Sequence, residues 1–255
     1  MAINFCKYQG TGNDFIMIDG RDGTVNFSAD EISSLCNRRF GIGADGLIII
    51  KQKEGVDFLM DYYNADGSQS FCGNGSRCAQ AFAQKLGMIQ NKSTFEAIDG
   101  IHLGRIEGSS FATKMGNVSE ITKVDSDYFI QTGSPHYVKY VKNVDEVDVY
   151  QEGKVIRNSE PYEQEGTNVN FVSVHQDHLK VRTYERGVED ETLSCGTGVT
   201  AVAISFLLQM NSEESSVNIA TRGGNLRIEL KRTASTTFEN IWLIGPAKEV
   251  FSGEI

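Results

Sequence analysis

Two stretches of this sequence decide its fold: CGNGSRCAQAFAQKLGM, residues 72–88, and CGTGVTAVAISFLLQM, residues 195–210. Each begins with Cys-Gly-x-Gly and continues into a segment that is apolar on most of its helical circumference. Helices of that kind are usually surrounded by other elements rather than laid on a surface. The two stretches therefore predict two buried helices, each entered through a tight glycine turn.

The same spacing recurs at two other places in the chain. Cys72 and Cys195 lie 123 positions apart, and the strand candidate 48–50 aligns with 172–174 at an offset of 124. The third pair, at an offset of 121, is Thr11-Gly12-Asn13-Asp14 with Thr132-Gly133-Ser134-Pro135. Three matches in order indicate a duplicated unit of about 120 residues. We therefore expect one domain formed by residues 1–120 with 245–255 and a second formed by 121–244.

Short strands separated by Gly, Asn and Asp turns fill most of the remaining sequence. Alternating polarity and β-branched residues predict strands over 14–20, 46–52, 57–64, 168–176, 178–187 and 225–232. Ser28 and Glu31 form a capping-box pattern that predicts a helix, and 143–157 reads as a polar, amphipathic surface helix. The predicted fold class is α+β: two similar domains related by a pseudo-two-fold, each a mostly antiparallel sheet or barrel around a central buried helix, with the active site in the cleft between them.

Length, charge and cysteine content exclude several classes of protein. The 255 residues, with 23% charged and 9% aromatic, fit neither a disordered chain nor a disulfide scaffold. A net charge of −10 argues against a nucleic-acid surface. The N-terminus lacks a basic segment followed by an apolar one, and the longest mostly apolar run, 199–208, is too short to span a bilayer. Because the five cysteines are odd in number and lack CxxC spacing, we expect reduced thiols in a cytoplasmic protein.

Three features are interpreted as structural rather than functional. Residues 41–46 match GxGxxG, but a helix candidate precedes them and a strand follows, the reverse of the order in dinucleotide-binding folds. His175 and His178, three apart on a predicted strand, should point to opposite faces, so we expect no zinc site. The cysteines outside the repeated motif are expected to be small buried hydrophobes: Cys6, Cys36 and Cys78.

Cys72 and Cys195 differ from the other thiols because each precedes a predicted buried helix. Unpaired N–H groups and the positive end of the helix dipole stabilise an anion there, which favours the thiolate. The glycines at 73, 75, 196 and 198 allow N–H groups to approach a bound carboxylate closely. Two such half-sites suit inversion at a carbon stereocentre, in which one group removes a proton from one face and the other delivers a proton to the opposite face.

The motifs resemble those of the diaminopimelate epimerase family over essentially the whole chain. They are GTGNDF (10–15), GIGADGL (41–47), NADGS and FCGNGSRC (64–78), TGSPH (132–136), NVNF (168–171), YERGVEDETLSCGTG (184–198) and GPAKEVFSGEI (245–255). The resemblance implies a cofactor-independent isomerase that converts LL-2,6-diaminopimelate into meso-diaminopimelate in lysine and cell-wall precursor biosynthesis. It also implies a homodimer. From the charge, the apolar runs and the His spacing described above, we expect no metal, nucleic-acid or membrane partner.

The resemblance assigns roles to particular residues of this sequence. Cys72 and Cys195 match the thiol pair that abstracts and returns the α-proton, and His136 and Glu185 match flanking residues that tune or orient them. The positions matching the substrate-binding set are Asn13, Asn64, Gly73, Asn74, Ser134, Asn168, Glu185, Arg186, Gly196 and Thr197. Arg186 suits the distal carboxylate of a long diacid through a bidentate pair. Two positions depart from the pattern, because Ser134 stands where several members carry Asn and Gly46 stands where some carry Gln.

Other functions remain open at the level of sequence. The closest is a racemase or epimerase of another amino acid on the same fold, of the proline or hydroxyproline type. A second class comprises non-catalytic small-molecule binding proteins, and a third comprises dithiol redox proteins that use Cys72 and Cys195. Substrate assays would distinguish the possible enzymes, and the response to mild oxidation would distinguish an epimerase from a redox protein.

Overall fold

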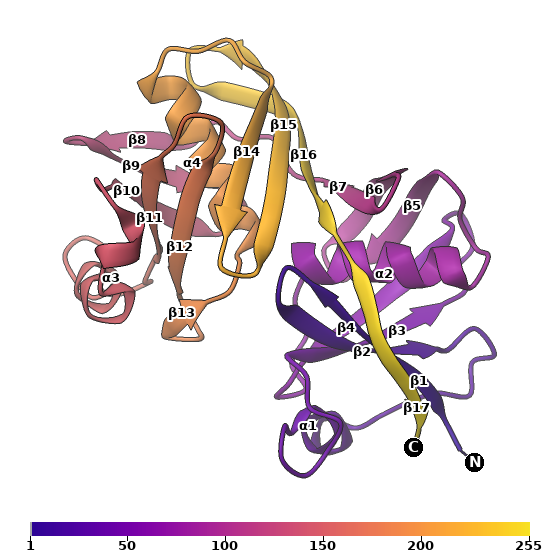
Figure 1. Cartoon of the computed structure of the whole chain (residues 1–255). Helices are drawn as coiled ribbons and strands as arrows, with labels where there is room; N and C mark the ends of the chain where they lie inside the picture. Colours follow the sequence, from indigo (N-terminus) through magenta and orange to yellow (C-terminus); the bar gives the residue numbers. More distant parts are fainter. Residues whose placement is uncertain (1) are drawn as a thin grey trace. The chain divides into compact units, whose positions relative to one another are not determined.

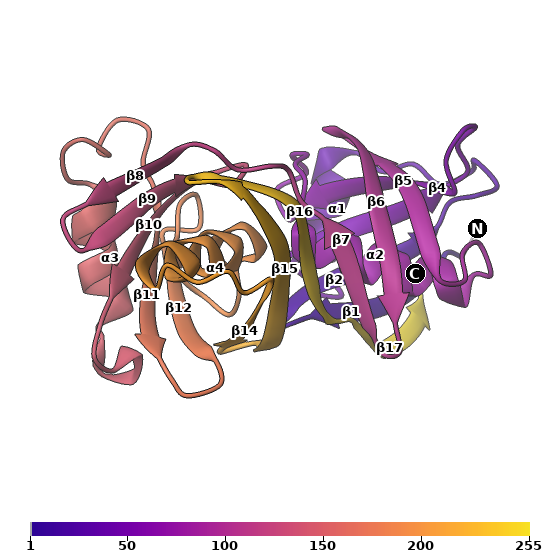
Figure 2. The ribbon, with the colours of Figure 1, turned by 90° about the horizontal axis from the view of Figure 1, so that it is seen from above.

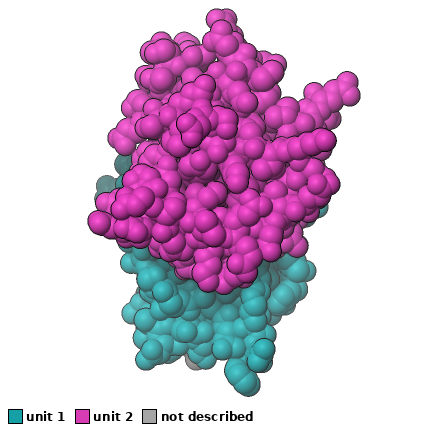
Figure 3. Space-filling model, turned by 90° about the vertical axis from the view of Figure 1, so that its left-hand side faces the viewer, with its two compact units in different colours: residues 1–113, 245–255 teal, residues 114–244 magenta. Residues whose placement is uncertain are grey.

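The computed structural model describes residues 2–255, which form two compact units. Within the described residues, unit 1 comprises 2–113 with Gly245–Ile255, and unit 2 comprises Lys114–Ile244 (Figure 3). The sequence predicts a domain boundary between residues 120 and 121, whereas in the structure the boundary lies between Thr113 and Lys114. Their origin as two copies of one unit, and a pseudo-two-fold between them, stay predictions.

Unit 1 is a run of eight strands with two helices. In chain order the elements are β1 (Asn4–Gly10), β2 (Asn13–Asp19), α1 (Ala29–Cys36), β3 (Gly46–Lys51), β4 (Phe58–Asn64), α2 (Gly73–Lys85), β5 (Lys92–Ala97), β6 (Gly100–Glu107), β7 (Ser110–Lys114) and β17 (Lys248–Glu254). The strands pair in the order 17-1-2-3-4-5-6-7, and the pairings β2–β3 and β4–β5 are parallel. Residues from the C-terminus thus complete the sheet of unit 1.

Unit 2 repeats this arrangement. Its elements are β8 (Ile121–Val124), β9 (Asp127–Gln131), β10 (Pro135–Tyr140), the 3-10 helix η1 (Val144–Glu146), α3 (Val149–Arg157), β11 (Asn168–Val174), β12 (Leu179–Glu185), β13 (Asp190–Thr192), α4 (Gly196–Gln209), β14 (Ser216–Thr221), β15 (Gly224–Ala234) and β16 (Thr237–Pro246). The strands pair in the order 8-9-10-11-12-14-15-16, and β10–β11 and β12–β14 are parallel. The sequence of parallel and antiparallel pairings is therefore the same in the two units.

A buried helix lies against the strands of each unit. In unit 1, α2 packs on β1–β4, and in unit 2, α4 packs on β9–β11, β14 and β15 (Figures 1 and 2). The core around α4 is almost wholly aliphatic, with Val199, Val202 and Leu207 fully buried. The core around α2 also encloses polar side chains of the helix, including Arg77 and Gln80. The predicted α+β fold, with mostly antiparallel strands and few helices, is confirmed.

The expected strands and three of the four expected helices are confirmed, and Ser28 and Glu31 form the predicted capping box. The single helix predicted over 143–157 is wrong, because two elements occupy that stretch. The side chain of Asn143 accepts a hydrogen bond from the N–H of Asp145, and that of Asp148 accepts one from Gln151. Each acceptor begins its own helix, and Val147 between them is extended.

Two local predictions about side chains are also wrong. His175 and His178 lie in the turn between β11 and β12, where the N–H of His175 donates to the carbonyl of His178 at 3.0 Å. The turn stacks their rings with centroids 4.8 Å apart instead of placing them on opposite faces. Cys6 is half-buried on β1, and Lys85 Nζ lies 3.4 Å from its Sγ. Cys36 and Cys78 are buried as expected.

Within residues 2–255, no helix combines the length and apolar character that crossing a bilayer requires. Residues 41–45 form the expected turn into buried β3, rather than the entrance to a helix.

Candidate active site

The first half-site begins at Cys72, which is the N-cap of α2. Its backbone is extended (φ −131°, ψ 114°), and its Sγ accepts a hydrogen bond from the N–H of Gly75 at 3.4 Å. A thiol sulfur in this place lies at the positive end of the helix dipole, where negative charge is stabilised. The local sequence thus places a partly exposed, ionisable thiol at the start of a buried helix.

Asn13 connects Cys72 to the β1–β2 hairpin. Its Oδ1 lies 3.5 Å from Cys72 Sγ and accepts a hydrogen bond from Asn74 Nδ2 at 3.4 Å. Its Nδ2 donates to Asp45 Oδ2 at 2.6 Å, which sets the orientation of the amide. The structure therefore brings three of the predicted site residues of unit 1 together: Asn13, Cys72 and Asn74.

A network of charges holds this corner of unit 1 in place. Asp14 forms ion pairs with Lys7 at 2.8 Å and with Arg38 at 2.7 Å, and Arg38 also pairs with Asp45 at 2.6 Å. Lys7 donates in addition to the carbonyl of Gly43. Burial alone would raise the pKa of Asp14, but its hydrogen bonds and ion pairs with Arg38 and Lys7 outweigh burial and lower the pKa to about 2. The hairpin that carries Asn13 is consequently anchored to the loop before β3.

Asn64, at the end of β4, belongs to a separate set of hydrogen bonds. Its Nδ2 donates to the hydroxyls of Ser68 and Ser70, and its Oδ1 accepts from Tyr62 at 2.8 Å. Gly46 pairs with Asn64 across the strands. A Cβ at Gly46 would lie 2.4 Å from the carbonyl oxygen of Tyr63, so this backbone has no room for a side chain there.

The second half-site begins at Cys195, which is the N-cap of α4. Its backbone matches that of Cys72 closely (φ −124°, ψ 116°), but its Sγ lies instead 3.4 Å from Thr197 Oγ1. The glycine at 198 is required by close packing, since a Cβ there would lie 2.4 Å from Asn170 Oδ1. At Gly75, the corresponding position of unit 1, the closest atoms are ends of flexible side chains at 3.2 Å or more.

Thr197 links Cys195 to His136. His136 is fully buried, and its Nε2 lies 2.9 Å from both Thr197 Oγ1 and Ser134 Oγ. Its Nδ1 lies 3.1 Å from Asn170 Nδ2. Because Asn170 Oδ1 accepts from Thr183, the Asn170 amide presents N–H to the ring, so Nδ1 accepts and Nε2 carries the proton.

His136 is held as a neutral imidazole. Burial, with a smaller contribution from the charge of Arg186, lowers the pKa of His136 to about 3. Its Nε2–H can then donate to one of the two hydroxyls beside it. Sequence reasoning missed Asn170, although NVNF places Asn168 and Asn170 two apart on one strand and hence on the same face.

The remaining predicted residues of unit 2 surround this cluster. Asn168 Nδ2 donates to the carbonyl of Pro135 at 2.9 Å and to Ser134 Oγ at 3.3 Å, while Asn168 Oδ1 accepts from the N–H of Arg186 at 2.9 Å. The guanidinium of Arg186 is exposed and donates to the carbonyl of Glu165 at 2.9 Å. Glu185 Oε2 accepts from Thr192 Oγ1 at 2.8 Å.

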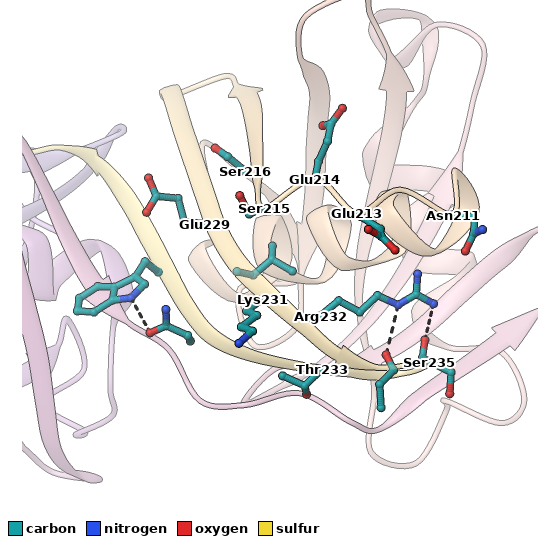
Figure 4. A pocket seen from close by; sticks show the side chains of 14 residues that line it. Asn211, Glu213, Glu214, Ser215, Ser216, Glu229, Lys231, Arg232, Thr233 and Ser235 are labelled. Carbon is teal, nitrogen blue, oxygen red and sulfur yellow. Dashed lines mark hydrogen bonds between the residues drawn. The ribbon is translucent and has the colours of Figure 1, made fainter.

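One surface depression of unit 2 is formed by none of the predicted site residues. It measures about 850 Å³ and is lined by residues after α4 and on β15 and β16, including Glu213, Lys231 and Arg232 (Figure 4). In the part of the chain that the structure describes, no group of three or more His, Cys, Asp or Glu side chains is placed to hold a metal ion.

Comparison with known proteins tests the resemblance seen in the motifs. The family model described as diaminopimelate epimerase matches residues 5–120 and 128–250. This chain belongs to the diaminopimelate epimerase family. Among curated members, the diaminopimelate epimerase of Flavobacterium psychrophilum is 49% identical, with 98% of each chain covered. That of Aquifex aeolicus is 39% identical, covering 99% of this chain and 98% of the relative.

Solved structures extend the likeness of fold beyond the diaminopimelate epimerase family. A phenazine biosynthesis protein of the PhzF family from Bacillus anthracis gives a TM-score of 0.78 at 14% identity, covering 100% of this chain and 99% of that one. A probable proline racemase from Agrobacterium radiobacter gives 0.70 at 12% identity, covering 99% and 92%. At these identities the match concerns the fold alone.

Proposed function

We propose that the chain inverts the α-carbon of LL-2,6-diaminopimelate to give meso-diaminopimelate, a step of lysine and cell-wall precursor synthesis, using Cys72 and Cys195 as the two acid/base groups. The observation that carries the proposal is the placement of each thiol at the N-cap of its own buried helix with nearly the same backbone geometry. Membership of the diaminopimelate epimerase family and the names of its members support the choice of substrate.

The reaction needs no oxidant, reductant or transferred group. The thiolate of one cysteine takes the α-proton, and the electron pair left on carbon spreads into the adjacent carboxylate. The thiol of the other cysteine gives its proton to the opposite face and becomes the thiolate. The helix N-termini at Gly73-Asn74 and Gly196-Thr197 supply N–H donors for the carboxylate where this charge accumulates. The scheme uses no cofactor and no metal.

Polar side chains near the thiols supply the rest of the proposed binding. Asn13 and Asn74 in unit 1, and Ser134, Asn168 and Thr197 in unit 2, hold donors and acceptors for the amino acid end of the substrate. Asn64 and Arg186 are assigned to the rest of the substrate, the exposed guanidinium of Arg186 offering a bidentate site for the distal carboxylate. His136 and Glu185 orient the groups around the thiols.

Reaction in D2O tests substrate and chemistry together. The purified enzyme is incubated with LL-diaminopimelate, meso-diaminopimelate and L-proline in separate assays, and the products are analysed by chiral chromatography and mass spectrometry. We expect inversion of diaminopimelate alone, with one solvent deuterium at the α-carbon of the product. Racemisation of proline, or inversion with the original hydrogen retained, would contradict the proposal. Reversible formation of a disulfide during turnover would favour a redox function instead.

We also propose a cytoplasmic homodimer. The support is the family resemblance and the need of two acid/base thiols for a reducing compartment. Light scattering on the purified protein should give twice the chain mass of 28.1 kDa, and a monomer mass would contradict the dimer.

A further inference from the structure

Arg77, one turn inside α2, is a fully buried cation that the reaction scheme does not use. Its Nη2 donates to Thr11 Oγ1 at 3.1 Å and to Asn74 Oδ1 at 2.9 Å, and its Nη1 donates to the carbonyl of Gly73 at 3.3 Å. Its Nε has no hydrogen-bond partner among residues 2–255. The guanidinium thus contacts neutral oxygens only, all of them next to the Cys72 half-site.

Such a charge is costly where it stands. A buried cation is normally paired with a carboxylate, and the N-terminal turn of a helix disfavours positive charge. The ionisable groups that favour the charged form of Arg77 are two thiols, Cys78 and Cys72. Burial lowers the pKa of Arg77 to about 10, which still leaves the guanidinium protonated at neutral pH. An anion that balances the charge of Arg77 would therefore have to lie at the N-terminus of α2.

The guanidinium also joins two segments that carry site residues. Thr11 and Gly12 form the β1–β2 turn with φ of 50° and 86°, and Thr11 is a β-branched residue in the left-handed region, a strained conformation. The bond from Arg77 ties this turn to Asn74, and Asn13 follows directly. Space beside this turn is tight, because a Cβ at Gly10 would lie 3.1 Å from the carbonyl oxygen of Asn74.

The corresponding position of unit 2 carries a neutral side chain, so the hydrogen bonds of the two residues can be compared. At the repeat offset of 123, Thr200 corresponds to Arg77. Thr200 Oγ1 donates to the carbonyl of Gly196 at 3.0 Å, just as Arg77 donates to the carbonyl of Gly73. A neutral hydroxyl therefore suffices for that hydrogen bond. What Arg77 adds in the first half-site is a positive charge and the hydrogen bonds to Thr11 and Asn74.

We propose that Arg77 is a positioning residue of the Cys72 half-site. The fork of its guanidinium, formed by Nη1 and Nη2, holds Asn74 and the Thr11 turn in place. Its buried charge makes Cys72 the thiol that ionises first. The inference deepens the proposed function and gives the two thiols unequal resting states, thiolate at Cys72 and thiol at Cys195. The cation stabilises the thiolate through space rather than through a direct bond, and it adds to the effect of the helix N-terminus.

Other charged groups in unit 1 bear on the same thiol. Cys78 lies on the same helix, and burial raises its pKa to about 12, so it stays neutral. From the β1–β2 hairpin and the loop before β3 come Asp14 and Asp45, which are balanced by Lys7 and Arg38. Cys78 is thus neutral and the two carboxylates are ion-paired, whereas the hydrogen bonds of the Arg77 guanidinium go to neutral oxygens.

The test is the pH dependence of alkylation of each cysteine without substrate. The intact, freshly reduced enzyme is treated with iodoacetamide from pH 5 to 10, and peptides containing Cys72 and Cys195 are quantified by mass spectrometry. The midpoint of a cysteine is the pH at which its alkylation reaches half the maximal rate. We expect the midpoint of Cys72 to be lower than that of Cys195. Arg77→Met should raise the Cys72 midpoint by about 1 pH unit or more and leave that of Cys195 in place. Arg77→Lys, which keeps the charge, should restore the Cys72 midpoint and show a raised KM because the fork is lost.

Lys85→Met is the matched control, since it removes a positive charge from the far end of the same helix, where Lys85 pairs with Glu249. It should move neither midpoint. A folded Arg77→Met enzyme with an unchanged Cys72 midpoint would overturn the proposal, and so would equal shifts in the Met and Lys variants. If Arg77→Met does not fold, the unaltered enzyme still decides, because a lower midpoint at Cys195 than at Cys72 contradicts the inference. Alkylation needs no turnover, so failure of the proposed reaction would be seen separately.

Discussion

The two half-sites share a backbone and differ in their polar surroundings. Cys72 and Cys195 both cap a buried helix with extended backbone, and the strands around them pair in the same pattern. Around Cys72 the polar groups are amides and a buried guanidinium, whereas around Cys195 they are hydroxyls and a neutral imidazole. The fold thus determines where the thiols stand, and the side chains determine how readily each one ionises.

This difference matters for a two-base reaction. At any moment one group must be a base and the other an acid, so two identical surroundings would place the protons at random. A cation near one thiol and a neutral donor near the other favour one of the two arrangements.

Removing either thiol should have the largest effect. Cys72→Ala or Cys195→Ala is expected to lower kcat for inversion by about 10²- to 10⁴-fold, because each face of the α-carbon then lacks its proton donor or acceptor. The measurement is chiral product analysis from both stereoisomers. Cys36→Ala is the control, since burial raises the pKa of Cys36 to about 11 and keeps it out of the chemistry. Near-normal inversion by either site variant would remove the basis of the two-base comparison.

The second prediction concerns the support of the imidazole. Asn170→Leu removes the donor to His136 Nδ1 and the acceptor for Thr183, so the ring loses its fixed orientation. We expect kcat/KM to fall by about 10- to 100-fold, with a loss of about 1–3 kcal/mol in the free energy of unfolding. Asn218→Leu, at an exposed position of β14, is the control. Unchanged kinetics in a folded Asn170→Leu enzyme would show that His136 needs no orientation.

The third prediction follows from the depressed pKa of His136. Burial lowers it from 6.5 to about 3, so between these values the unfolded chain binds a proton that the folded chain does not. Stability from this group is therefore complete above pH 6.5 and is lost as the pH falls. Because of this one imidazole, the free energy of unfolding should drop by about 2 kcal/mol from pH 7 to pH 5. Urea titrations of the enzyme and of His136→Gln at both pH values measure it, and an equal drop in the two proteins would contradict a neutral buried imidazole.

The smallest effect is expected at the counterpart of Arg77. Thr200→Val removes one hydrogen bond to the carbonyl of Gly196 and no charge. The free energy of unfolding should fall by about 1 kcal/mol. The alkylation midpoint of Cys195 should stay where it is, in contrast to the shift of Cys72 in Arg77→Met. A comparable shift at Cys195 would mean that packing, rather than charge, sets the ionisation of both thiols.

Sequence reasoning succeeded where a residue's role depends on its neighbours in the chain. The capping box at Ser28 and the buried helix after Gly198 are properties of short segments, so periodicity and spacing predict them. It failed where a side-chain acceptor or a turn interrupts the pattern. Asp148 starts a new helix inside a periodic stretch, and the turn after β11 stacks His175 on His178.

Arg77 and Asn170 show the same limit at the candidate site. Arg77 belongs to the motif FCGNGSRC and Asn170 to NVNF. The motifs do not predict that Arg77 is a buried cation or that Asn170 faces an imidazole. Those facts depend on contacts between segments distant in the chain, Thr11 with Arg77 and His136 with Asn170.

The sequence by itself determined the family, the α+β class and the position of a cysteine at the start of each buried helix, because glycine turns and hydrophobic period are local properties of the linear chain. Tertiary structure alone decided the electrostatic surroundings of each half-site. Burial and the charges of distant residues set the protonation of a side chain, and both exist only once the strands and helices of a unit have packed.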